Sequence, residues 1–212
     1  MKKYTHIIWD WNGTLLDDLK LCIAKANVML SKRGLALIDS IEAHHKIFGF
    51  PIKDYYQRAG FDFEKEAFED LASEFIKMYH ENEKDFKLFP EVNSLLSDIN
   101  KSGIKQIILS ASEINNLLRQ VKLFDIQDYL DEVLGISDIY AASKILIGKD
   151  YMERIKPEKA LFIGDTIHDK EVADALGIDC ILIANGHQSK ETLLNSKAKV
   201  LESLNDIRNI IL

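Results

Sequence analysis

The stretch that decides the fold is IIWDWNGT, residues 7–14, in which an apolar run ends in an acid and then a turn. A second stretch far downstream, ALFIGDTIHD at residues 160–169, repeats that order. Each pattern is typical of a buried strand that ends in a loop carrying a carboxylate. In open parallel sheets, ligands bind outside the carboxyl ends of the strands. We therefore expect Asp10, Asp165 and Asp169 to meet at one rim of a sheet.

The composition excludes several classes of protein. Of 212 residues, 47% are apolar and 29% are charged, so one compact unit with an insertion can bury a sizeable core. The net charge is −7 and no long basic run occurs, which argues against nucleic acid as a partner. Cys22 and Cys180 form no CxxC pair, which favours the reducing cytoplasm. Asp10 interrupts the first apolar run well short of a membrane span, so we expect no membrane association.

Hydrophobic periodicity divides the chain into two parts. From about Leu19 to Asp85, apolar residues recur at three and four spacings, which predicts helices. From Pro90 onward, helix and strand patterns alternate, which predicts a doubly wound α/β core. The expected strands there are 106–109, 133–136, 160–163 and 180–184, and the expected helices are 92–100, 114–123, 144–155, 170–176 and 204–211. We assign residues 1–16 and 88–212 to a parallel-sheet core and residues 17–87 to an inserted, all-helical cap.

The acids at the strand ends suggest a metal-assisted nucleophile. Asp10 stands where a carboxylate can attack an electrophile or bind a metal. Asp165 and Asp169 are four residues apart and follow Gly164, which suits an oxygen-ligated Mg²⁺. The same spacing also suits the cap of a helix N-terminus, so the pair by itself leaves both interpretations open.

Two further positions fit a phosphoryl group. Ser110 follows the apolar strand, where its hydroxyl and the next backbone amides could hold phosphate oxygens. Lys144 lies at the start of an expected helix, where a fixed cation could screen the charge between a carboxylate and a phosphoryl group. Lys149 is a rival for that role, and we favour Lys144.

The order Asp-x-Asn-Gly-Thr, Ser, Lys, Gly-Asp-x-x-x-Asp resembles the haloacid dehalogenase (HAD) superfamily, particularly its phosphoglycolate phosphatase-like branch. The resemblance spans nearly the whole chain. It implies a Rossmann-like core under a helical cap, and it implies hydrolysis of a small phosphomonoester through an aspartyl-phosphate intermediate. The four ordered motifs are specific for the superfamily and say little about the substrate.

Carried over by position, the resemblance implies that Asp10 is the nucleophile and that Ser110 and Lys144 act on the phosphoryl group. It implies that Mg²⁺ is held by Asp10, the main-chain carbonyl of Asn12 and Asp165, with support from Asp169. We assign Thr14, Ser110, Ala111, Phe48 and Gly49 to substrate binding, the last two in a loop that could close over the substrate. Nearby His44, His45 and Lys53 could meet an anionic substrate tail.

Asn12 departs from the pattern of the superfamily. Its phosphatases normally carry aspartate there, which protonates the leaving oxygen and then deprotonates the attacking water. Asparagine can do neither, and general acid–base catalysis contributes on the order of a hundred to ten thousandfold, so we expect a slow enzyme. His168 is one candidate for a substitute acid. Deamidation of the Asn12-Gly13 pair would be another source of a carboxylic acid.

Other functions stay open. A phosphometabolite-binding protein would keep the pocket after losing turnover. A haloacid dehalogenase would share the nucleophile and the cap but would have no use for the paired acids after Gly164. A phosphonatase-type hydrolase needs a cap lysine for a Schiff base, and no clear one stands out. The pattern is compatible with a monomer or a homodimer.

Overall fold

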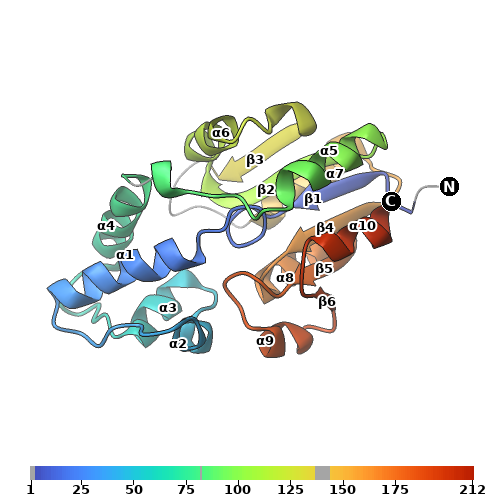
Figure 1. The fold of residues 1–212 in the computed structure, drawn as a ribbon. Helices are drawn as coiled ribbons and strands as arrows, with labels where there is room; N and C mark the ends of the chain where they lie inside the picture. Colours follow the sequence, from blue (N-terminus) through green and yellow to red (C-terminus); the bar gives the residue numbers. More distant parts are fainter. Residues whose placement is uncertain (1–2, 82, 137–143) are drawn as a thin grey trace.

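The computed structural model describes residues 3–81, 83–136 and 144–212, and its centre is a six-stranded parallel sheet (Figure 1). The strand order is β3-β2-β1-β4-β5-β6. The strands are β1 (His6–Trp9), β2 (Lys105–Glu113), β3 (Glu132–Ile136), β4 (Ala160–Gly164), β5 (Asp179–Ile183) and β6 (Lys199–Leu201). The chain runs outward from β1 to β3 and then returns to β4, beside β1. This reversal places the ligand crevice outside the carboxyl ends of β1 and β4 and confirms the predicted doubly wound core.

Helices cover both faces of the sheet. One face carries α5 (Val92–Lys101), α6 (Ile114–Leu123) and α10 (Asn205–Ile211), and the other carries α7 (Lys144–Ile155) and α8 (Ile167–Leu176). Successive strand residues point to opposite faces, so Ile7 and Trp9 pack with the first group and Ile8 packs with the second. Trp9 and Trp11 are fully buried in the first cluster.

The observed boundaries differ from the expected ones in physically understandable ways. β2 is longer than expected, because its ladder with β3 resumes after a register shift between Leu109 and Glu113. α8 begins three residues early, because Thr166 and Asp169 form a capping box. Two elements were not anticipated, α9 (Lys190–Leu194) and β6, since segments this short carry little periodicity.

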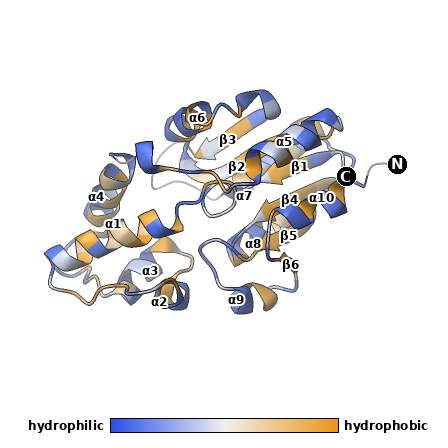
Figure 2. Cartoon of the chain, in the orientation of Figure 1, coloured by the Kyte–Doolittle hydropathy of each residue, from blue (hydrophilic) through white to orange (hydrophobic). Residues whose placement is uncertain are grey.

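Among the described residues, four α-helices lie between β1 and α5, to one side of the sheet (Figure 1). They are α1 (Leu19–Lys32), α2 (Ile41–Ile47), α3 (Ile52–Ala59) and α4 (Phe68–His80), and we call this unit the helical insertion. It encloses a hydrophobic cluster of its own. Figure 2 shows hydrophilic and hydrophobic residues mixed along α1 and α4, as in amphipathic helices. Leu16 and Leu88 form an isolated antiparallel bridge where the chain leaves and rejoins the core.

Two single-turn 3₁₀ helices, η1 (Glu83–Asp85) and η2 (Gln127–Tyr129), complete the described elements. Across the described ranges, none of the helices combines the length and the apolar character needed to cross a bilayer.

Candidate active site

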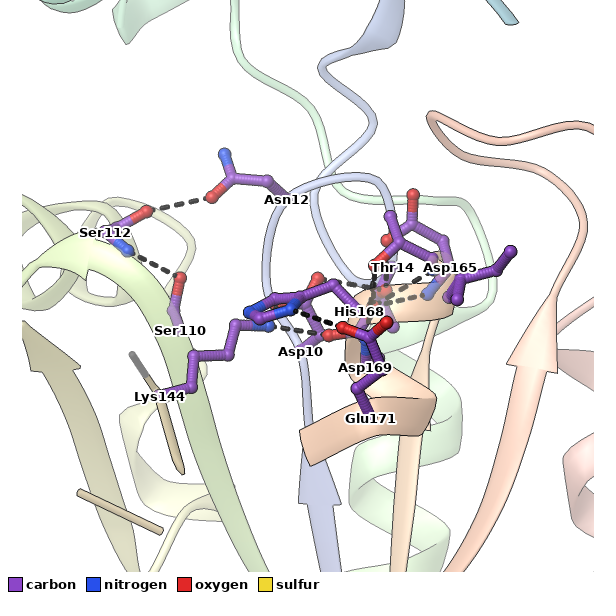
Figure 3. A network of polar contacts seen from close by, with 12 residues as sticks. Asp10, Asn12, Thr14, Ser110, Ser112, Lys144, Asp165, His168, Asp169 and Glu171 are labelled. Atoms are coloured by element: carbon purple, nitrogen blue, oxygen red, sulfur yellow. Dashed lines mark hydrogen bonds and ion pairs between the residues drawn. The ribbon is translucent and has the colours of Figure 1, made fainter. Parts of the chain in front are cut away.

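Three buried carboxylates meet at the rim of the sheet (Figure 3). Asp10 follows β1, Asp165 follows β4, and Asp169 lies in the first turn of α8. One oxygen from each carboxylate lies within 4.8 Å of the other two. The side chains come together because parallel strands that are neighbours in the sheet end at the same edge. The structure thus brings together the three acids that the sequence placed at one rim.

Thr14 and two glycines shape the space around Asp165. Thr14 Oγ1 lies 3.2 Å from Asp10 Oδ2 and 3.0 Å from Asp165 Oδ1, so it can donate to either carboxylate. Gly13 has a positive φ of 72°, and a side chain there or at Gly186 would overlap the Asp165 carboxylate. Thr14, which we expected to bind substrate, is fully buried, and the contacts that the structure gives its hydroxyl are with these carboxylates.

Lys144, the first residue of α7, joins two of the acids. Its Nζ donates to Asp10 Oδ1 and, at 2.7 Å, to Asp169 Oδ1. The lysine side chain is only 4% exposed. Lys149 lies on the same helix but is exposed to solvent. Between the two candidate lysines, Lys144 is therefore the one placed beside the carboxylates.

Asp169 caps helix α8 and also belongs to the acidic cluster, and its spacing from Asp165 had suggested both roles. Its Oδ2 accepts hydrogen bonds from the Thr166 backbone nitrogen at 3.0 Å and from Thr166 Oγ1 at 2.7 Å, which caps α8. Its Oδ1 accepts from Lys144. A side chain at Gly164 would collide with this carboxylate. Helix capping and a place in the acidic cluster are compatible here because each uses a different oxygen.

Burial and mutual repulsion shift the ionisation of the cluster. Burial raises the pKa of Asp10 to about 6, although the Lys144 ammonium opposes that shift. Burial also raises the pKa of Asp165 to about 8, against the effect of His187 and with help from the charges of Asp10 and Asp169. For Lys144, burial favours the neutral amine, but the two neighbouring carboxylates outweigh it and raise the pKa.

These residues fit a divalent cation. Three buried carboxylates face one ammonium group, so full ionisation leaves surplus negative charge in a buried site, which is costly unless a cation neutralises it. The cluster offers only oxygen donors, which Mg²⁺ prefers over nitrogen and sulfur. Asp10 and Asp165, whose pKa values are raised, are the carboxylates that a bound cation would help to ionise.

The Asn12 side chain connects the sheet to the helical insertion. Its Oδ1 accepts a hydrogen bond of 2.8 Å from Ser112 Oγ on β2 (Figure 3). Its Nδ2 donates to Asp18 Oδ2 and to the Tyr79 hydroxyl, both at 2.8 Å. Asp18 precedes α1, and Tyr79 lies on α4. The Asn12 side chain is thus fixed by three hydrogen bonds.

Asp18 is the centre of a buried polar network that the sequence did not reveal. It accepts from the Tyr79 hydroxyl at 2.6 Å and from the Gly13 nitrogen at 3.0 Å, and it lies 3.2 Å from His187 Nε2. Burial alone would raise the pKa of Asp18, but the bonds from His187, Tyr79 and Asn12 lower it to about 2. The backbone nitrogen of His187 also donates to Asp165 Oδ2 at 2.7 Å.

A cavity of about 300 Å³ opens over the carboxylates. Ser110, Ala111 and Ser112 line it on the side of the sheet, and Phe48 lines it on the side of the insertion. Ser110 Oγ accepts from the Ser112 nitrogen at 3.0 Å, so one of the amides expected to bind phosphate is already bonded within the chain. Gly49, expected to bind substrate, is not among the described lining residues and lies near Arg58 and Gln188 instead.

The three histidines that we considered have different surroundings. His45 Nε2 lies 3.0 Å from the Gly186 carbonyl oxygen. His168 stacks on Phe50 and its Nδ1 lies 3.2 Å from Glu171, but it is not among the described residues that line the cavity. His44 lines the cavity and is fully buried. Burial, with the neighbouring His187 and His45, lowers the pKa of His44 to about 3. His44 is therefore neutral near pH 7 and offers no positive charge to an anionic substrate.

This lowered pKa predicts a pH-dependent loss of stability. Below about pH 6.5 the unfolded chain protonates His44 while the folded chain does not, so the free energy of unfolding decreases as the pH is lowered. The contribution between about pH 6.5 and 5 is ~1.5 kcal/mol. Denaturant unfolding of the parent and of His44→Phe, which preserves an aromatic ring, should show a steeper decline for the parent over this range. Parallel curves would contradict the assignment.

Comparisons with known proteins agree with this geometry. The family model for haloacid dehalogenase-like hydrolases matches residues 7–183. A phosphoglycolate phosphatase of Nitrosococcus oceani is 26% identical over 100% of this chain and 98% of its own length. An N-acetylmuramic acid 6-phosphate phosphatase of Pseudomonas putida is 24% identical over 85% of this chain and 83% of its own length. A haloacid dehalogenase-like hydrolase of Streptococcus pneumoniae has the same fold, with a TM-score of 0.84 and 20% identity over 99% of both chains. The predicted superfamily is thereby confirmed, and the chain belongs to the haloacid dehalogenase-like hydrolases.

Proposed function

We propose that this hydrolase is a Mg²⁺-dependent phosphatase that releases phosphate from a small phosphomonoester through a phosphorylated Asp10. The observation that carries the proposal is the placement of Asp10 at the floor of a cavity, in contact with Lys144 and beside two further carboxylates. Relatives named as phosphatases support the same reaction class. The two free cysteines suit a cytoplasmic enzyme.

In the first step, a carboxylate oxygen of Asp10 forms a bond to phosphorus while the bond from phosphorus to the leaving oxygen breaks. Lys144 screens the charge between the carboxylate and the phosphoryl group. Ser110 and Ala111 line the cavity where phosphoryl oxygens would lie. Water then attacks the phosphoryl group, which releases phosphate and restores Asp10. Mg²⁺, held by Asp10, the Asn12 carbonyl and Asp165 with support from Asp169, would neutralise phosphoryl charge.

Asn12 limits which esters react well. The departing oxygen needs a proton unless it is already a stable anion, and an amide side chain has no acidic proton to give. Aryl and acyl phosphates, whose leaving groups are weakly basic, should therefore react faster than alkyl phosphates.

We further propose that residues 17–87 act as a cap over the site. Support comes from the cavity itself, which residues of the insertion and of the sheet line together. The bonds from Asn12 to Asp18 and Tyr79 connect the two parts directly above the site. A cap of this kind keeps bulk water away from the reacting groups and selects the leaving group.

The test is phosphate release from p-nitrophenyl phosphate and acetyl phosphate, with Mg²⁺ and with a chelator in its place. We expect release that depends on Mg²⁺. Release that is unaffected by chelation would contradict the metal dependence. Halide release from a 2-haloacid without Mg²⁺ would favour a dehalogenase instead.

A phosphometabolite-binding protein is the second candidate, favoured by the amide at position 12. It predicts that a phosphorylated ligand raises the melting temperature without any turnover, since a ligand that binds only the folded state stabilises it. Long incubation followed by a sensitive phosphate assay separates this candidate from a slow enzyme.

A comparison of two lysines on α7 tests the role of Lys144. Lys144→Met leaves Asp10 and Asp169 without their cation, so we expect turnover to fall at least ~100-fold and stability to fall by about 3 kcal/mol. Lys149→Met changes an exposed side chain of the same type and should alter neither quantity. Turnover is measured below the melting temperature of each variant. Equal effects of the two substitutions would rule out a special role for Lys144.

A further inference from the structure

The cavity has two chemically different ends. At the sheet it ends in the carboxylates and Lys144. Away from the sheet, its walls come from the helical insertion and are mostly apolar or aromatic, among them Phe48, Tyr55, Phe68, Phe75 and Ile76. A phosphoryl group at Asp10 would thus have its ester group directed into the apolar end. Such walls favour an apolar ligand, because burial of apolar surface is favourable in proportion to its area.

Among the described lining residues, the apolar end offers no unpaired cation to an anionic leaving group. His80 contacts Glu83, His187 contacts Asp18, and His44 is neutral near pH 7. Among the described residues that line the cavity, Lys144 is the only lysine or arginine, and it already contacts two carboxylates. Lys53, which could have met an anionic tail, lies over the Phe63 and Phe68 rings and outside the described lining. Glu113 adds an acidic group to the wall. A second carboxylate or phosphate on the substrate would lose its hydration here without gaining a partner.

We propose that the preferred substrate is the phosphate monoester of an uncharged, predominantly apolar alcohol, with the apolar group packed against the insertion. This inference rests on the proposed function, and it separates this chain from the relative named as a phosphoglycolate phosphatase, because phosphoglycolate carries a carboxylate. The apolar walls select the substrate through its leaving group, while the carboxylates and Lys144 act on the phosphoryl group that all substrates share.

A series of alkyl phosphates tests the inference without changing leaving-group chemistry. Ethyl, butyl and hexyl phosphate release similar alkoxides, so the missing acid at position 12 affects all three equally. Each fully buried methylene contributes ~0.8 kcal/mol, or about fourfold in kcat/KM. We expect hexyl phosphate to exceed ethyl phosphate by at least ~10-fold, which requires only part of the four extra methylenes to be buried. Phosphoglycolate should fall below ethyl phosphate. A flat series, or a preference for phosphoglycolate, overturns the inference.

Two aliphatic side chains of equal size, Ile76 and Leu37, give a matched pair of variants. Ile76 is half-buried on α4 and lines the cavity. Ile76→Asn should reduce the ratio of the hexyl phosphate rate to the ethyl phosphate rate by about threefold or more. Leu37 is 56% exposed and outside the described lining, so Leu37→Asn should leave the preference intact. Equal losses of preference in both variants would contradict the role of the apolar wall.

Binding of phosphonates separates failure of the inference from failure of the proposed function. Hexylphosphonate and phosphonoacetate carry carbon–phosphorus bonds that a phosphatase does not cleave, so calorimetry with Mg²⁺ reports affinity alone. Tighter binding of hexylphosphonate in the absence of any ester turnover supports the inference and contradicts the phosphatase. Turnover combined with a flat alkyl series and no preference for hexylphosphonate supports the phosphatase and overturns the inference. Binding of neither phosphonate also overturns it.

Discussion

Asp10→Asn is expected to lower phosphate release by at least ~10⁴-fold, because an amide cannot replace a carboxylate as the nucleophile. The substitution preserves the size of the side chain, and Lys144 keeps its 2.7 Å contact with Asp169. Covalent labelling gives a second measure. Acid quenching during turnover of acetyl phosphate should leave a phosphoryl adduct on the peptide containing Asp10 in the parent and none in the variant.

Unfolding cannot account for the expected loss in Asp10→Asn. Burial raises the pKa of Asp10 to about 6, so the folded protein favours its neutral form, and ionisation at Asp10 costs stability above that pH. A neutral amide removes this cost, and we expect the melting temperature near pH 7.5 to stay the same or rise. Asp17→Asn, an exposed position seven residues along the same segment, is the control and should keep full activity. A variant of Asp10 that retains activity within tenfold of the parent would exclude it as the nucleophile.

The sequence predicted those parts of the site that follow from strand order. Asp10 and Asp165 could be placed together because each directly follows an apolar run, and the ends of adjacent parallel strands share one edge. The contact of Lys144 with Asp10 could be anticipated only from the ordered motifs, since helical periodicity does not distinguish it from Lys149.

The other residues of the site are brought together by tertiary contacts that no local sequence pattern predicts. Tyr79 occupies the apolar face of α4, where its spacing is that of any core residue, yet its hydroxyl reaches Asp18. His187 lies in a loop after β5 and contacts Asp18, which is 169 residues away in the sequence. Ser112, which donates to Asn12, lies in the part of β2 where the register with β3 shifts, a feature that the apolar run alone did not indicate. Polar networks of this kind require the tertiary structure, because their members come from segments with unrelated patterns.

Restoring an acid at position 12 is expected to raise the turnover of alkyl phosphates by ~10² to 10⁴-fold, but only when Asp18 is changed as well. In the parent, Asn12 Nδ2 donates to Asp18 Oδ2 at 2.8 Å. Asn12→Asp alone replaces that donor with an acceptor and places a partly buried carboxylate in contact with the buried carboxylate of Asp18. The pair would hold a proton between them or push the side chain at position 12 away. We therefore expect the single variant to be less stable than the parent and to gain little activity.

The double variant Asn12→Asp with Asp18→Asn exchanges the amide and the carboxylate. An amide at position 18 can donate to the new acid, and its oxygen can still accept from the Gly13 nitrogen, which now donates to Asp18 at 3.0 Å. Ser112 Oγ can continue to donate to position 12. Net charge and the hydrogen bond between positions 12 and 18 are preserved, so the double variant should be more stable than Asn12→Asp. It loses the charge pair between Asp18 and His187 and the acceptor for Cys22 Sγ.

The measurement is the rate of phosphate release from p-nitrophenyl and ethyl phosphate by the parent, both single variants and the double variant. A restored acid should accelerate ethyl phosphate far more than p-nitrophenyl phosphate, because only the alkoxide requires a proton as it leaves. Asp18→Asn alone controls for the loss of the His187 contact and should not gain activity. Peptide mass analysis of the parent verifies that position 12 is still asparagine. Equal gains for both substrates would mean that position 12 acts on the shape of the site and not on the leaving oxygen.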